Sequence, residues 1–306
     1  MADFVSHHLF GEQALPVFPM PAQRAAARRP ACFFWGCQGP DPLFYRKIVF
    51  GSPLHKTGNR MHSEKTAELF AALARTVHCL SDEAREMAEA YFYGFLCHYA
   101  LDSEIHPYVY CRQEQLHSAN VRLLSSAIHC EIETDIDCVL YQRHTGRAVT
   151  TFKPGDHYQL DSAELAVLAC ILRAVLLSVY GEDVPTHDLR RAFEEMLSWQ
   201  EFFYAEHRTV YHGAQNIERL LGRGALISGH MKTAYPSWDC LNDDHAPWYN
   251  LERPNEVRTE SVEDLFSLAR IRAAALAGQY AAQFDASLQL QQAFPLPFDY
   301  GSPRRV

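Results

Sequence analysis

The stretch HYALDSEIHPYV, residues 98–109, places two imidazoles and a carboxylate at intervals of four residues, as His98, Asp102 and His106. On an α-helix, residues four apart are neighbours whose Cβ atoms lie about 5–6 Å apart. One metal ion could therefore join Asp102 to either histidine. His98 and His106 would lie about 12 Å apart along the axis, at about 1.5 Å per residue, which is too far for one ion to hold all three easily. Such a helix face serves at least two ions, with Asp102 as their natural bridge.

A second pair of this kind stands in SAIHCEIETDID, where His129 and Glu133 are again four residues apart on a predicted helix. Together with His106 from the preceding helix they form a three-ligand set with an open position. That pattern is typical of a catalytic zinc site rather than a closed structural one. The ion at the opening stretch needs more partners, and the candidates are Asp41 in the turn GCQGPDPLFY, His62 in NRMHSEKT, and His7 and His8 in SHHLFG.

Each of these motifs is weak when taken alone, because short motifs often match by chance. A single His-x3-Asp pair on a helix is more often an exposed polar pair, and GPDP is more often only a turn. The conjunction is stronger: His-x3-Asp-x3-His followed by His-x3-Glu, preceded by an Asp and a His, is hard to produce by structural need. It predicts a metal centre.

Composition limits the class of protein. The 306 residues carry 28 Lys and Arg against 37 Asp and Glu, and a net charge of −9 argues against nucleic acid as a stable partner. Nine cysteines, an odd number without a C-x-x-C pair, suit a reducing compartment. The start has no signal-peptide pattern, and the apolar stretch 162–181 contains Glu164 and Arg173, so a buried core helix is favoured over a membrane span. We expect a cytoplasmic protein without a transmembrane segment.

Helical periodicity dominates the chain and predicts one all-α domain over residues 1–306. Ser81 followed by acidic residues starts one helix, and Pro107 is expected to end it. The only tempting strand is 149–153, and Pro- and Gly-containing loops are expected at 11–60 and 225–258. The predicted helices are 63–80, 81–106, 117–144, 162–180, 187–207, 212–222 and 260–287.

The motifs resemble those of the zinc-dependent phospholipase C family, whose structural relatives include the single-strand-specific zinc nucleases. HHLFGEQAL, GCQGPDPLFY, YFYGFLCHYALDSEIHPYV and, more weakly, CLNDDHAPWYN are similar to its unsecreted bacterial branch. The resemblance implies a multi-helix bundle with two or three zinc ions. It assigns Asp41, His62, His98 and Asp102 to the first zinc, His106, His129 and Glu133 to the second, and His7 with the bridging Asp102 to the third.

Three departures from the secreted members matter. Those members complete the third site with the amine and carbonyl of an N-terminal Trp, whereas this chain starts Met1–Ala2. Removal of Met1 would leave an amine five residues before His7, so a three-zinc enzyme and a two-zinc enzyme with a free amine both stay open. Pro42 replaces the aromatic residue that follows the turn Asp in choline-preferring members, which leaves a phosphocholine preference unsupported. Residues 225–306 are predicted as loop plus helix, without a lipid-binding β-domain.

The resemblance implies cleavage of a phospholipid on the glycerol side of its phosphate, giving diacylglycerol and a phosphorylated head group. It makes Asp41 the candidate catalytic residue, which accepts or orients the proton of a water whose pKa zinc lowers. Phospholipid or another phosphoester is the expected substrate, with transient contact to a membrane surface. Two alternatives remain: a nuclease or nucleotidase on the same scaffold, and a non-catalytic metal- or lipid-binding protein.

Overall fold

Helices make up most of the chain in the computed structural model, which describes residues 4–119, 125–204, 228–231, 235–282 and 292–303 together with Gly213, Asn216 and Glu218. Short 3-10 turns lie at Leu15–Val17, Val149–Thr151 and Ser228–His230, and a π turn at Leu176–Tyr180. The α-helices are α1 (Phe4–Ala14), α2 (Met20–Arg28), α3 (Pro30–Cys37), α4 (Pro42–Tyr45), α5 (Pro53–Ser63), α6 (Thr66–Cys79), α7 (Asp82–Ala119), α8 (Ser125–Thr145), α9 (Gly155–Tyr158), α10 (Ser162–Val175), α11 (Thr186–Tyr204) and α13 (Val262–Ala281).

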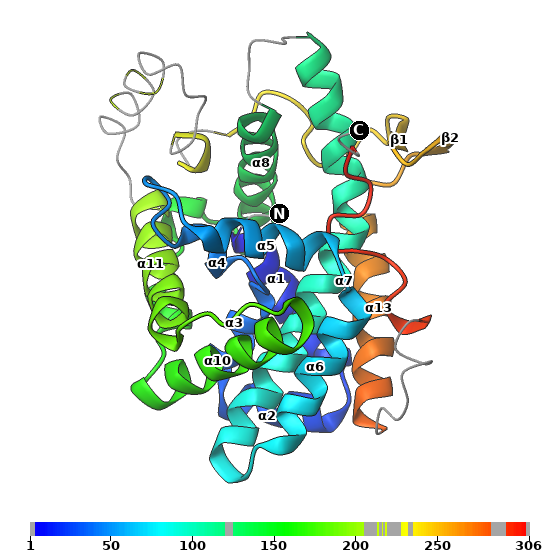
Figure 1. Cartoon of the computed structure of the whole chain (residues 1–306). Coiled ribbons are helices and arrows are strands. Elements are labelled where there is room, and N and C mark those ends of the chain that lie inside the picture. The colour runs from blue at the N-terminus through cyan, green and yellow to red at the C-terminus, as the bar shows by residue number, and fades with distance from the viewer. Residues whose placement is uncertain are drawn as a thin grey trace.

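Strands β1 (Trp248–Asn250) and β2 (Arg253–Arg258) form an antiparallel hairpin, the one sheet within the described residues. The hairpin lies at one end of the molecule, and its second strand is almost entirely exposed (Figure 1). The all-α prediction is therefore confirmed. The hairpin itself was not predicted, because it lies in the segment expected to be loop.

Helix α7 organises the fold. Its 38 residues span about 57 Å at about 1.5 Å per residue, and it runs through the middle of the bundle in Figure 1. Asp82 and Glu83 in its first turn favour the start of a helix through the macrodipole. Helices α1, α2, α3, α6, α8, α10 and α13 all pack against it.

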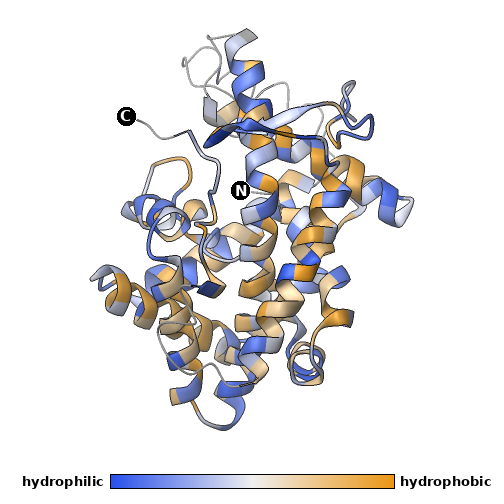
Figure 2. Cartoon of the chain, turned by 90° about the vertical axis from the view of Figure 1, so that its right-hand side faces the viewer, coloured by the Kyte–Doolittle hydropathy of each residue, from blue (hydrophilic) through white to orange (hydrophobic). Residues whose placement is uncertain are grey.

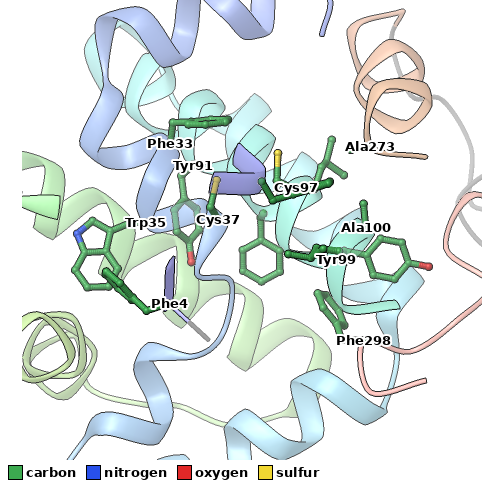
Figure 3. Packing of buried hydrophobic residues seen from close by; sticks show 14 of the residues in the cluster. Phe4, Phe33, Trp35, Cys37, Tyr91, Cys97, Tyr99, Ala100, Ala273 and Phe298 are labelled. Atoms are coloured by element: carbon green, nitrogen blue, oxygen red, sulfur yellow. The ribbon is translucent and has the colours of Figure 1, made fainter. Parts of the chain in front are cut away.

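Helices α3 and α7 approach so closely that their backbones touch. A Cβ on Gly36 would lie 2.1 Å from the Tyr91 carbonyl oxygen, and one on Gly94 would lie 2.0 Å from that of Phe33. Aromatic and sulfur side chains fill the space around this contact, including the fully buried Cys37 (Figure 3). The contact fixes the end of α3, and with it the turn that carries Asp41, against the middle of α7.

The prediction of loop over residues 11–60 was wrong because prolines in this region start helices. Pro30, Pro42 and Pro53 stand at the first position of α3, α4 and α5. A proline at that position loses no intrahelical hydrogen bond, and its fixed φ suits a helix. Ser52 caps α5, because its hydroxyl accepts a hydrogen bond from the Leu54 amide at 3.3 Å.

Pro107 does not end the helix that was expected to stop there, since α7 continues to Ala119. An internal proline removes one hydrogen bond and costs about 3 kcal/mol or more. Burial on both sides of the proline opposes that cost, because Ile105, Tyr108 and Val109 are completely buried. The helix therefore continues through Pro107 without interruption.

Other boundaries also differ from prediction. The helix predicted at 117–144 begins at Ser125 within the described residues, and that predicted at 63–80 is α6, which begins three residues later at Thr66 and ends at Cys79. Residues 149–151 form a 3-10 turn rather than a strand. The helix predicted at 212–222 lies mostly outside the described residues.

The apolar stretch Ser162–Tyr180 is long and apolar enough to cross a membrane by length and composition, but half of it is buried inside the protein. Leu168, Leu172 and Val175 on this stretch are fully buried, and α10 packs on α6, α7 and α11. These contacts are those of a core helix. Figure 2 shows the apolar residues distributed through the interior of the bundle, with a largely hydrophilic hairpin at its end.

Candidate metal centre

All eight predicted ligands are brought to one place by four helices and one turn. We call His7, Asp41, His62 and His98 the deep cluster, and His106, His129 and Glu133 the outer cluster, with Asp102 between them. Within the described residues, three groups could hold an ion: His7–Asp41–His98, His62–His98–Asp102 and His106–His129–Glu133. Helix α1 supplies His7, the turn before α4 supplies Asp41, α5 supplies His62, α7 supplies His98, Asp102 and His106, and α8 supplies His129 and Glu133.

The deep cluster is a compact set of imidazoles and carboxylates. Nε2 of His62 lies 3.1 Å from Oδ1 of Asp41 and 3.8 Å from Oδ2 of Asp102. Nε2 of His98 lies 3.1 Å from Oδ2 of Asp102 and 3.9 Å from Oδ1 of Asp41. Each of these side chains is at most 5% exposed, so the cluster is closed to bulk water.

The outer cluster uses the i, i+4 spacing of α8. Nε2 of His129 lies 3.0 Å from Oε1 of Glu133, and Nε2 of His106 lies 3.8 Å from the same oxygen. His129 is 13% exposed at its side chain, more than any other ligand candidate. The outer cluster is therefore the part of the centre with access to solvent.

Asp102 lies near histidines of both clusters. Oδ2 is the atom near His62 and His98, whereas Oδ1 lies 3.8 Å from Nε2 of His106 and 3.2 Å from Nε2 of His7. Oδ1 thus faces one histidine of each cluster and Oδ2 faces two histidines of the deep cluster, so this carboxylate is placed to bridge the clusters.

His7 lies where the two clusters meet, with its Nε2 3.2 Å from Oδ1 of Asp102. The third zinc site predicted for these two residues stays a prediction. The His7 ring stacks on His98 with centroids 4.2 Å apart, and His7 shares one candidate group with Asp41 and His98. The N-terminal amine considered as a partner lies outside the described residues. His8, the alternative partner, faces away: its Nε2 lies 3.5 Å from Glu12 and its ring packs on Phe34.

Four histidines have their Nδ1 atom fixed by an oxygen that can only accept. The partners and distances are the carbonyls of Gly58 for His62 (2.8 Å), Cys37 for His98 (3.2 Å) and Phe298 for His106 (2.6 Å), and the amide oxygen of Gln113 for His129 (2.7 Å). Each Nδ1 must carry the proton, so each Nε2 offers a lone pair. This is the arrangement that orients histidine ligands of metals.

The free atoms fit zinc. Nε2 of His62, His98 and His106 and both oxygens of Asp102 are buried without a hydrogen-bond partner among the described residues, a state that is rare in native proteins. Two ligands at about 2.0–2.1 Å from one tetrahedral zinc lie about 3.3 Å apart, and the closest pairs here lie 3.0–3.2 Å apart. Imidazole and carboxylate are the donors that zinc takes in catalytic sites.

The pKa shifts favour a charged Asp102 beside neutral His106 and His129. Burial alone would raise the pKa of Asp102, but His98, His106 and His7 hold it well below its usual range. Burial lowers the pKa of His106 to about 3, and it lowers the pKa of His129 well below its usual value. At neutral pH, therefore, protons do not compete for Nε2 of the outer histidines.

A buried aspartate on α8 anchors the helix that carries His7. Oδ2 and Oδ1 of Asp137 accept hydrogen bonds from the amides of Val5 (2.9 Å) and Ser6 (2.8 Å), and Tyr204 also donates to this carboxylate. Helix α1 has no acidic residue in its own first turn, so Asp137 supplies the negative charge that a helix N-terminus favours. Its position, four residues after Glu133, ties α1 to the outer cluster.

Gly39 is required where the Asp41 turn passes α7. It has φ +52°, and a Cβ there would lie 2.2 Å from the His98 ring. The glycine therefore lets the turn reach the metal centre without displacing a ligand.

The partners of the ligands were not found from the sequence. Gln113 is an ordinary polar residue on a helix, and the Phe298 carbonyl belongs to a segment with no metal motif. Asp299 also lies beside the deep cluster, where its amide donates to the His62 carbonyl at 3.3 Å and burial raises its pKa to about 6. A main-chain oxygen has no signal in the sequence, because every residue has one.

A family model described as zinc dependent phospholipase C matches residues 6–179 of the chain. The matched region contains all eight ligand candidates but ends before the segment that holds Phe298. No curated protein and no solved structure matches the chain.

Proposed function

The chain belongs to the zinc-dependent phospholipase C family, and from this premise we propose that it hydrolyses phospholipids to diacylglycerol and a phosphorylated head group. The hydrolase class and the use of zinc follow from the family. The lipid substrate and the side of cleavage are the proposal, as is a cytoplasmic location with transient contact to a lipid surface.

One observation supports it most strongly: the buried carboxylate of Asp102 lies within 3.1–3.8 Å of histidines from both ligand clusters. Asp102 and the histidines of the two clusters would hold zinc, which would supply Lewis-acid chemistry by binding phosphate oxygens and lowering the pKa of water. The protein supplies buried Nε2 atoms whose direction is already fixed by their Nδ1 hydrogen bonds. The ligands therefore need little rearrangement to receive ions.

Asp41 is the residue we propose as the proton acceptor. Its Oδ1 is buried, has no hydrogen-bond partner among the described residues, and lies 3.1 Å from Nε2 of His62. It stands on a turn rather than within a helix, so unlike Asp102 it is not held rigidly by α7. A proton taken from an attacking water would move to this oxygen.

The test is a substrate panel with purified, zinc-loaded protein. The panel contains vesicles of phosphatidylcholine, phosphatidylethanolamine and phosphatidylglycerol, a soluble chromogenic phosphodiester, and single-stranded DNA and RNA. Products are identified by mass. Asp41→Asn, which conserves the shape of the side chain, serves as the inactive control, with its zinc content measured in parallel.

The outcomes separate the proposals. Release of diacylglycerol from one or more lipids, lost in Asp41→Asn, supports the phospholipase C assignment. Release of nucleotides with intact lipids would establish the nuclease alternative. Full zinc content with no hydrolysis of any substrate would leave a non-catalytic metal-binding protein.

A further inference from the structure

The described C-terminal segment, residues 292–303, lies against the metal centre although it is far from every ligand in sequence. We call it the C-terminal strap. In Figure 1 it is the red trace that passes along α7. A Cβ on Gly301 would lie 2.9 Å from Cα of Pro107, so the strap runs directly over the proline that follows His106. It begins more than one hundred residues after the family match ends at residue 179.

The main chain of Phe298 contacts a ligand from each cluster. Its amide donates to the His62 carbonyl at 2.9 Å, and its carbonyl accepts from Nδ1 of His106 at 2.6 Å. His62 belongs to the deep cluster and His106 to the outer cluster. One peptide residue thus spans the two clusters, by two hydrogen bonds that run in opposite directions.

The side chain of Phe298 holds that main chain in place. It is completely buried, and its ring centroid lies 5.7 Å from those of His62 and His98. The ring also packs edge-on against Tyr99 at 5.1 Å, as Figure 3 shows. Pro295 and Pro297 restrict the φ angles on its N-terminal side.

We propose that Phe298 is a positioning residue that fixes the histidines of the two clusters relative to each other. The inference rests on the zinc binding of the proposed function but not on its substrate. Paired metal ions in hydrolases lie about 3.5–4 Å apart, so the separation of the two ligand sets must be held closely. Loss of an outer hydrogen-bond partner of a histidine ligand lowers metal affinity about 10–100-fold.

The experiment compares Phe298→Ala with Phe193→Ala. Phe193, in α11, is also 1% exposed, and its ring packs on Trp35 of α3 rather than on a ligand histidine. Zinc affinity is measured by equilibrium competition with a chromophoric chelator, and the visible spectrum of the Co²⁺-loaded protein reports the ligand geometry. Melting temperatures are recorded for both variants.

Both substitutions open a cavity and should lower the melting temperature. Phe298→Ala keeps the carbonyl but removes the ring that holds it on Nδ1 of His106. Of the two substitutions, only this one should therefore lower zinc affinity, by up to about 10–100-fold, and change the Co²⁺ spectrum. Phe298→Leu keeps an apolar side chain against the histidines but loses the ring, so its zinc affinity should fall less than that of Phe298→Ala and stay below that of Phe193→Ala. This milder variant also provides the measurement if Phe298→Ala does not fold.

The positioning role is overturned if Phe298→Ala and Phe193→Ala have equal zinc affinities and equal Co²⁺ spectra. If Phe298→Ala does not fold, the same comparison is made between Phe298→Leu and Phe193→Ala. An unaltered protein that binds zinc but cleaves none of the substrates would overturn the proposed function while leaving this inference standing. An unaltered protein without zinc affinity would overturn both.

Discussion

In the deep cluster, His62 and His98 donate Nδ1 hydrogen bonds to main-chain carbonyls of Gly58 and Cys37. In the outer cluster, His129 donates to the side chain of Gln113, and His106 depends on a carbonyl 192 residues away. A carbonyl at a helix end or within a helix moves little, whereas an amide side chain can rotate away. The ligands of the outer cluster are thus more exposed and less rigidly oriented than those of the deep cluster. The two clusters should therefore differ in their affinity for zinc and in how much zinc they lose on mutation.

The largest effect should follow from removing the residue that joins the clusters. Asp102→Asn keeps the side chain's shape but loses its charge, so at least one zinc equivalent should be lost. Turnover should fall by at least about a hundredfold, the upper end of the effect of losing an outer partner. Metal analysis and initial rates measure this, with the exposed His187→Ala as control. Full zinc occupancy in Asp102→Asn would remove the bridging assignment.

Removal of zinc should lower the stability of the whole protein, because Asp41, Asp102 and Glu133 are then left buried beside one another. Ligand linkage predicts a loss in unfolding free energy of about 2.7 kcal/mol per site at a free zinc concentration 100 times Kd, and about 4.1 kcal/mol at 1,000 times. Chelator titration followed by thermal melting measures it. Because the outer cluster is more exposed and less rigidly held, its zinc should leave first. An unchanged melting temperature after complete chelation contradicts the site.

A smaller and more selective effect is expected from Gln113→Ala. It removes the Nδ1 partner of His129, so the affinity of the outer cluster for zinc should fall about 10–100-fold, whereas the deep cluster keeps its ion. Gln115→Ala is the matched control, because Gln115 is the same residue type on the same helix and is exposed. Equal zinc affinity in the two variants would show that the outer cluster does not depend on this side chain.

The smallest effect concerns pH and the zinc-free protein. The unfolded chain takes up a proton on His106 near pH 6.5, but the folded chain does so only near its pKa of about 3. Stability of the chelated protein should therefore fall as pH drops below about 6.5, by up to about 1.4 kcal/mol per pH unit for one such histidine. Denaturant unfolding at pH 6.5 and 5.5 measures the slope, and His106→Asn should reduce it. Equal slopes in both proteins would mean that other groups carry the dependence.

The sequence was sufficient to predict which candidate ligands lie together, but not which groups orient them. Spacing of four residues on a helix fixes which side chains share a face, so His98, Asp102 and His106, and His129 with Glu133, could be named in advance. The prolines were misjudged, because Pro30, Pro42 and Pro53 start helices and Pro107 lies inside one. Which of these roles a proline takes depends on the burial of its neighbours, which is a property of the fold.

The hydrogen-bond partners could not be predicted for a different reason. Cys37, Gly58 and Phe298 act through carbonyl oxygens, which every residue has, and only tertiary structure selects among them. The role of Asp137 in anchoring α1 could not be predicted either, since its partners are amides about 131 residues earlier. The predicted single domain over residues 1–306 and the roles of the individual ligands stay predictions.

The hydrogen bond between His106 and the C-terminal strap can form only late in synthesis, because the strap is made long after His106. His106 obtains its orienting carbonyl from a residue made 192 positions later, which at about 5–20 residues per second emerges about 10–40 seconds afterwards. Until then the nascent chain can fold its first helices but holds His106 without its partner. Such a chain should exchange zinc faster than the finished one, so firm metal retention marks a chain whose translation has passed Phe298.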